Sequence, residues 1–245
     1  MALVTGGSRG IGKATSVLLG RAGFDVCINY RRGHDTAAEA LRAVEADGGR
    51  GWLFQADVSQ ESEVLSMFEA IDARDGPLRA LVNNAGVLDS QTSLTGITVE
   101  RINRVFATNV VGAMVCAREA VRRMSGRFGG AGGAIVNVSS VASRYGAPHE
   151  YVDYAASKGA IDTFTLGLAV EEAPHGIRVN AVRPGIIDTD IHADGGEPGR
   201  VERLSRSLPM QRGGTAEEVA AAIVWLLSDE ASYVNGTLLD VAGAR

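Results

Sequence analysis

The chain has 245 residues, of which 45% are hydrophobic and 22% are charged, as in an ordinary globular protein. Its formal net charge of −5 argues against nucleic acid or an anionic membrane surface as the main partner. A small molecule that carries phosphate is not excluded, because binding it needs only a local basic patch.

The two cysteines, Cys27 and Cys116, lie in apolar stretches and are interpreted as small buried side chains. There is no CxxC pair and the histidines are scattered, so no metal site is predicted. No signal peptide is visible, and the apolar runs are too short to span a bilayer. Together these features predict a cytoplasmic protein.

Short apolar runs rich in β-branched residues alternate with helix-like segments along the chain. The expected strands are 2–5, 25–30, 51–55, 80–83, 134–139, 177–181 and 237–241. The expected helices are 11–22, 36–47, 61–73, 99–124, 151–173 and 216–227. This alternation predicts an α/β fold with one domain over residues 1–245. Its core is a Rossmann-type, doubly wound parallel sheet of about seven strands, with helices on both faces in three layers.

Residues 186–214 break the alternation, since they are polar and rich in Gly, Pro and Arg. A long segment of this kind inside a compact domain is usually functional, so we expect a substrate lid with a short helix near 199–207. The alternative is a disordered insertion.

A glycine-rich turn, TGxxxGxG, lies between the first expected strand and the first expected helix, at residues 5–12. Glycines let the backbone approach a ligand closely, and a helix N-terminus favours negative charge. The turn therefore predicts a site for the pyrophosphate of a dinucleotide, with Gly6, Gly10 and Gly12 as its fixed points. The alternative is a tight turn that binds nothing.

The second expected strand ends at Tyr30 and is followed by Arg31 and Arg32. Sites that prefer NAD commonly place an acidic residue here to bind ribose hydroxyls. Arginines favour a 2′-phosphate instead, and Arg9 in the glycine turn adds a second positive charge. These residues favour NADP over NAD, unless the two arginines only form a solvated surface.

Tyr154 and Lys158 lie four residues apart, early in the expected helix over 151–173. This spacing places both side chains on one helix face. A nearby cation lowers the pKa of a phenol, which then serves as an acid in reduction and a base in oxidation. Neither Tyr151 nor Tyr145 has a lysine four residues further on.

Several polar residues follow expected strands at the carboxyl edge of the sheet, where open parallel sheets bind ligands. They are Asp57–Val58, Asn83–Gly86, Ser139–Ser140, Pro184–Gly185 and Thr189. Asp57 is equally compatible with capping the helix that follows it. Asn109 lies within an apolar helix, where an uncompensated amide is costly, so we expect it to belong to a polar network.

Taken together, these motifs resemble the short-chain dehydrogenase/reductase family over essentially the whole chain. The resemblance implies that Tyr154 is the general acid/base, Lys158 its partner, Ser140 the ligand of the reacting oxygen and Asn109 the holder of a relay water. Ser139 remains an alternative to Ser140. The implied cofactor-binding residues are Gly6, Ser8, Arg9, Gly10, Ile11, Tyr30, Arg31, Asp57, Val58, Asn84, Ala85, Gly86, Tyr154, Lys158, Pro184, Gly185, Ile187 and Thr189.

The resemblance implies an NADP(H)-dependent oxidoreductase that interconverts a small-molecule carbonyl and a secondary alcohol. It also implies a homotetramer or dimer, with no nucleic acid and no membrane as partner. Two alternatives stay open: an NAD-dependent sugar or alcohol dehydrogenase, and a regulator that senses NADP(H) without turnover. His149 and His192 are expected near the pocket mouth.

Overall fold

The computed structural model describes all residues from Met1 to Arg245. Seven strands form one sheet in the order β3-β2-β1-β4-β5-β6-β7, and every neighbouring pair is parallel. The strands are β1 (Ala2–Val4), β2 (Asp25–Tyr30), β3 (Arg50–Gln55), β4 (Ala80–Asn83), β5 (Gly133–Val138), β6 (Ile177–Pro184) and β7 (Leu238–Val241). The predicted Rossmann-type α/β fold is confirmed. The strand order reverses between β1 and β4, the place where folds of this kind bind ligands.

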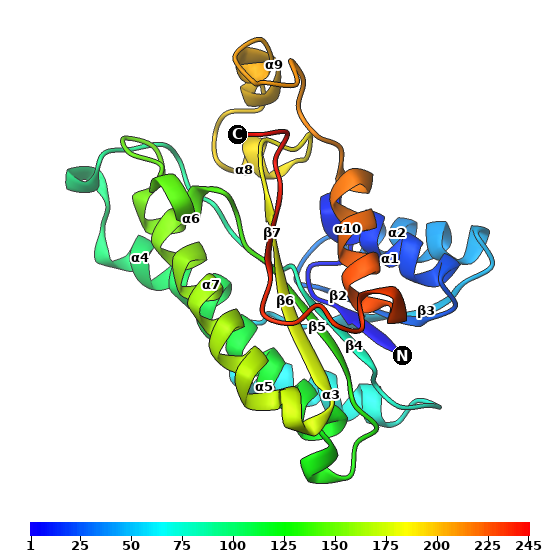
Figure 1. Ribbon diagram of the computed structural model, residues 1–245. Coiled ribbons are helices and arrows are strands. Elements are labelled where there is room, and N and C mark those ends of the chain that lie inside the picture. Colours follow the sequence, from blue (N-terminus) through cyan, green and yellow to red (C-terminus); the bar gives the residue numbers. More distant parts are fainter.

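Helices cover both faces of the sheet in three layers (Figure 1). One face carries α1 (Gly10–Arg21), α2 (His34–Ala46) and α10 (Ala216–Leu227), whose apolar side chains form one core cluster with the strands. The other face carries α3 (Glu61–Asp72), α5 (Ala113–Met124) and α7 (Val152–Glu172), which contribute to the second cluster. The strands are apolar on both sides because both sides are covered.

The predicted helix over 99–124 is present, but its hydrogen-bonding pattern changes in the middle. It consists of α4 (Val99–Phe106), a π-helical turn (Ala107–Gly112) and α5. Gly112 packs closely against the loop that follows β3, since an added Cβ would lie 2.6 Å from the Val58 carbonyl oxygen. The π-helical turn contains Asn109, and such turns commonly mark functional sites.

Residues 186–214, here called the 186–214 segment, form two short helices, α8 (Ile191–Asp194) and α9 (Arg200–Ser205). The sequence predicted the second but not the first. Both lie beyond the carboxyl ends of the strands, near the C-terminus (Figure 1). The two ends of the segment are joined by an isolated parallel β-bridge between Ile187 and Gly214.

None of the helices combines the length and the apolar character that crossing a bilayer requires. Cys27 and Cys116 are free and buried, as predicted. The remaining short elements are α6 (Ala142–Tyr145) and the 3-10 turns Leu94–Gly96, Gly126–Phe128, Ala173–His175 and Asp229–Ala231.

Candidate active site

A cavity of about 740 Å³ lies along the carboxyl edge of the sheet and crosses the point where the strand order reverses. All the residues predicted to bind a cofactor line it, as do Ser140, Tyr154 and Lys158. Of the predicted catalytic residues, only Asn109 is not part of its lining. The fold therefore brings together residues from positions 6 to 189 that the sequence places far apart.

The glycine turn between β1 and α1 has a backbone that only glycine accommodates well. Gly6 and Gly10 have φ angles of +59° and +51°. A Cβ on Gly12 would lie 2.2 Å from the Gly6 carbonyl oxygen and 2.6 Å from Nδ2 of Asn84. No side chain caps the N-terminus of α1, so its first N–H groups are available to a phosphate.

Two neighbouring side chains hold the glycine turn in place. Asn84 donates its Nδ2 to the carbonyl oxygens of Thr5 and Gly6, at 2.9 and 3.0 Å. The Gly6 N–H donates to Oδ1 of Asn29 at 3.2 Å, and Asn29 in turn donates to the Ala56 carbonyl at 3.0 Å. Asn84, which the resemblance implies to be a cofactor-binding residue, thus supports the turn with its amide nitrogen.

The end of β2 forms the basic part of the cavity. Arg31, Arg32, Gly33 and Thr36 line it beside the N-terminus of α2. Arg31 lies 3.6 Å from the Asp57 carboxylate. That carboxylate already accepts hydrogen bonds from the N–H and the hydroxyl of Ser59, at 3.0 and 2.7 Å. Asp57 therefore closes the turn before α3, while the N-cap of that helix is Gln60.

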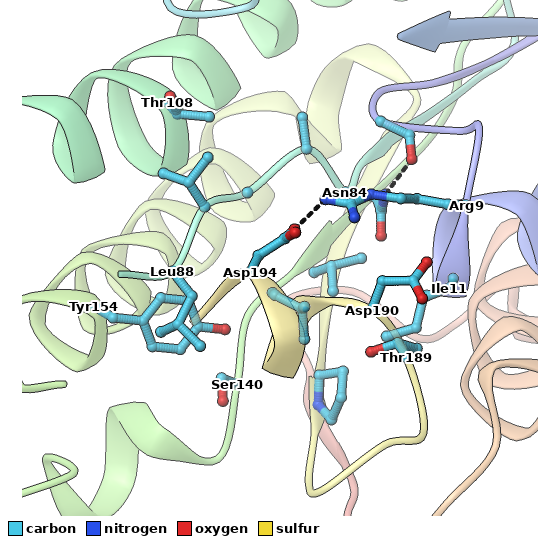
Figure 2. Close-up of a pocket in the computed structure, with 18 of the residues that line it drawn as sticks. Arg9, Ile11, Asn84, Leu88, Thr108, Ser140, Tyr154, Thr189, Asp190 and Asp194 are labelled. Carbon is cyan, nitrogen blue, oxygen red and sulfur yellow. Dashed lines mark hydrogen bonds and ion pairs between the residues drawn. The ribbon is translucent and has the colours of Figure 1, made fainter. Parts of the chain in front are cut away.

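Tyr154, Lys158 and Ser140 all line the cavity, and Figure 2 shows Tyr154 and Ser140 lying near each other in it. The Lys158 ammonium lies 5.5 Å from the centre of the Tyr154 ring and donates to the Val138 carbonyl at 2.8 Å. Ser139, the predicted alternative, is buried and donates its hydroxyl to the Lys158 carbonyl at 3.2 Å. Of the two serines, Ser140 is the one beside the phenol.

Burial is the largest influence on the pKa values of Tyr154 and Lys158. It raises the pKa of Tyr154 to about 12, against a smaller lowering by the Ser140 hydroxyl. It lowers the pKa of Lys158 to about 8, against a smaller raising by Asp162. The sequence predicted a lowered pKa for the tyrosine, whereas burial raises it.

Asn109 belongs to a polar network, as predicted. Its side-chain amide donates to the Val87 carbonyl at 3.0 Å and to the Ser157 hydroxyl at 3.1 Å, and it accepts from the Val87 N–H at 2.8 Å. Ser157 lies between Tyr154 and Lys158 in α7. The π-helical turn thus fixes the loop after β4 against the helix that carries the tyrosine.

The 186–214 segment covers the glycine turn. A Cβ on Gly10 would lie 3.2 Å from the Thr189 side chain. Asp194 of α8 reaches across the cavity to form an ion pair with Arg9 in the turn (Figure 2). No local pattern in the sequence predicts this pair, because its members are 185 residues apart.

The part of the cavity beside Tyr154 has an apolar floor. Leu88 and Tyr154 pack against a buried cluster of Ala142, Ala147, Tyr151 and Ala155. His192, expected at the mouth, lines the cavity but is buried, with Nε2 bonded to the Ile187 carbonyl at 3.0 Å. His149 does not line it. Leu88 and Tyr151 belong to no motif, so the sequence does not predict them as residues of the site.

Known proteins similar to this chain share its length and fold. Residues 6–243 match a family described as Enoyl-(Acyl carrier protein) reductase. The chain is 60% identical to the uncharacterized oxidoreductase YgfF of Escherichia coli (strain K12), over 100% of this chain and 99% of that protein. It is 40% identical to 3beta-hydroxysteroid dehydrogenase 1 of Eggerthella lenta, over 98% of this chain and 91% of that protein.

The fold is also similar to that of a solved structure. It is a short chain dehydrogenase from Burkholderia cenocepacia J2315 in complex with NADP, 34% identical to this chain, with a TM-score of 0.89. The similarity covers 99% of this chain and 96% of that one.

Proposed function

The chain belongs to the short-chain dehydrogenase/reductase family and is an oxidoreductase, and we propose that it transfers a hydride between NADP(H) and a carbonyl–secondary alcohol pair. One observation carries the proposal: Ser140, Tyr154 and Lys158 share a cavity with a glycine turn whose helix N-terminus is uncapped. A proton donor and a phosphate site in one cavity are what such a reaction requires.

Bound NADPH supplies the hydride, while the protein supplies position and the proton. In reduction, the Tyr154 hydroxyl donates a proton to the substrate oxygen, which the Ser140 hydroxyl orients by a hydrogen bond. Lys158 lies beside the phenol and stabilises the phenolate left behind. Asn109 bonds to the Val87 backbone and to Ser157, and so fixes the position of α7 relative to the loop after β4.

In the oxidation direction Tyr154 must instead accept a proton. Burial opposes this, since it raises the pKa of the phenol to about 12. The Lys158 ammonium beside the ring favours the phenolate and opposes this effect of burial. We infer that Tyr154 serves more readily as the acid in reduction than as the base in oxidation.

We assign the 2′-phosphate of NADP to Arg31 and Arg9. Arg31 is bound only by a long contact to Asp57, and its neighbours Gly33 and Thr36 line the same pocket at the N-terminus of α2. The similar structure from Burkholderia cenocepacia contains NADP. An NAD-preferring site would present an acidic side chain at the position of Arg31.

Titration of the purified protein with NADPH and with NADH, followed by nicotinamide fluorescence, tests this assignment. We expect NADPH to bind about 10- to 100-fold more tightly, the value of one or two charge-assisted hydrogen bonds. Arg31→Ala should remove most of that preference. Arg42→Ala, at an exposed position on α2, is the matched control and should retain it. A preference for NADH would overturn the assignment, and binding of neither would overturn the dinucleotide site.

Three further properties belong to the same proposal. We propose that residues 1–245 act as one catalytic domain and that the 186–214 segment is its substrate lid. Exposed apolar side chains on the α5–α7 face, including Met114, Leu166 and Val170, support a homotetramer or dimer built through that face. Light scattering of the purified protein measures the oligomer size. The two buried free cysteines support a cytoplasmic location.

A further inference from the structure

The part of the cavity beside Tyr154 that remains for a substrate is apolar. Leu88, Ile186 and Ile191 line it together with the buried cluster of Ala142, Ala147 and Tyr151. Leu88 also supports the 186–214 segment, since an added Cβ on Gly195 would lie 3.0 Å from its side chain. These side chains come from the loop after β4, from α6 and the residues between it and α7, and from the stretch between β6 and the first residue of α8.

The arginines that border this part are all engaged in ion pairs with carboxylates of the protein. Arg104 forms an ion pair with Asp89, and Arg9 with Asp194. Arg200 is buried and is held by Glu150 at 2.6 Å and by Glu197 at 2.8 Å. Glu197 is paired again with Arg203.

The charge left without an ion-pair partner at this end is negative. Asp190 lines the cavity and takes part in none of the ion pairs, although Arg9 lies near enough to feel its charge. The remaining cation, Lys158, is committed to the Val138 carbonyl and to the phenol. An anionic substrate would therefore lose its water without gaining a cation, which is costly in a partly buried site.

We propose that the substrate is an uncharged carbonyl compound with a compact apolar body, such as a ring ketone, and that carboxylates and phosphates are rejected. The inference rests on the proposed function, because it concerns what the same hydride-transfer site accepts. The apolar floor binds the body of the molecule, and the internal ion pairs remove every cation that would bind an anion.

A matched pair of probes separates charge from shape: 4-oxocyclohexanecarboxylate and its methyl ester. Both carry the same ring ketone, and only the first is charged at neutral pH. With saturating NADPH, we expect kcat/KM for the ester to exceed that for the acid by about tenfold or more, the effect of one uncompensated charge. Equal values, or a preference for the acid, would overturn the inference.

A variant that frees a cation tests the cause. Asp89→Asn leaves Arg104 unpaired at the cavity wall, so the ratio of kcat/KM for acid to ester should rise by roughly threefold, the scale of one exposed ion pair. Asp72→Asn removes a similar ion pair with Arg123, outside this cavity, and should leave the ratio unchanged. An unchanged ratio in Asp89→Asn would show that paired charges do not set the preference and would overturn the argument.

Failure of the proposed function is distinguishable from failure of this inference. If neither probe, nor any member of a panel of charged and uncharged aldehydes and ketones, is reduced while NADPH still binds, the hydride-transfer proposal is overturned. If both are reduced but the acid is preferred, hydride transfer stands and only the substrate class is wrong.

Discussion

The glycine turn and the 186–214 segment face each other across the cavity and are held by different kinds of force. The turn is fixed by sterics, since a single added carbon on Gly12 would lie 2.2 Å from a carbonyl oxygen. The segment is held by one isolated bridge and by ion pairs. Arg9–Asp194 and Arg203–Glu197 are largely half-exposed, whereas Arg200, which pairs with Glu150 and Glu197, is buried. Exposed ion pairs contribute about 0–1 kcal/mol each. Because a steric contact admits one backbone arrangement and an exposed ion pair holds only weakly, we propose that the glycine turn is the more rigid of the two regions.

Tyr154→Phe tests the chemistry at the place where the two regions meet. Removing the hydroxyl removes the proton donor but leaves the glycine turn intact, so kcat should fall by roughly 10²- to 10⁴-fold. The Kd for NADPH should stay within about twofold, because the phenol does not support the phosphate site. Steady-state kinetics and fluorescence titration measure the two effects.

Tyr233→Phe is the matched control, because that tyrosine is fully exposed and lies outside the cavity. It should behave as the wild type in both measurements. Retention of turnover in Tyr154→Phe would remove the tyrosine from the mechanism. An unchanged cellular effect of that inactive variant would favour a cofactor-sensing role.

Gly12→Ala and Gly199→Ala probe the two regions with the same substitution. The first forces a carbon against the Gly6 carbonyl and Asn84, so we expect the free energy of unfolding to fall by about 3 kcal/mol and NADPH binding to be lost. The second places a carbon where nothing lies within 4 Å and should change the free energy of unfolding by less than about 1 kcal/mol. Urea denaturation measures both. Equal effects would contradict the proposed difference in rigidity.

The pH dependence of reduction reports on the buried pair. Tyr154, whose pKa burial raises to about 12, stays protonated as the acid at neutral and mildly alkaline pH. Lys158, whose pKa burial lowers to about 8, loses its charge as the pH rises through that value. The kcat/KM for the carbonyl should therefore fall above about pH 8, at most tenfold per unit. In Lys158→Arg the decline should disappear, since arginine stays charged. A flat profile in the wild type would contradict a charged Lys158 in the mechanism.

The sequence predicts the cofactor side well because its determinants are local. A strand, a glycine turn and a helix follow each other within residues 2–21, and Tyr154 and Lys158 are one helical turn apart. Sheet order then follows from alternating strands and helices. The substrate side is set by pairs such as Arg9–Asp194 and Arg200–Glu150, which join residues far apart in the chain. These two ion pairs correspond to no periodic pattern in the sequence. The π-helical turn at Asn109 corresponds to none either.

The ion pair that joins the two regions gives the smallest predicted effect. Arg9 is assigned to the cofactor's phosphate, and in the structure it forms an ion pair with Asp194. Asp194 and the phosphate therefore compete for one guanidinium. Asp194→Asn should lower the Kd for NADPH by about twofold to fivefold, because the exposed pair no longer has to be broken.

Three features distinguish competition from a general change in charge. The gain should be larger for NADPH than for NADH, and about 0.5 M salt should abolish it, because screening weakens both the pair and the phosphate contact. Asp47→Asn, which removes a comparable exposed ion pair with Arg21, should change neither Kd. Weaker NADPH binding in Asp194→Asn would reverse the interpretation. Asp194 would then hold the 186–214 segment over a bound cofactor, and the substrate side would contribute to cofactor affinity instead of opposing it.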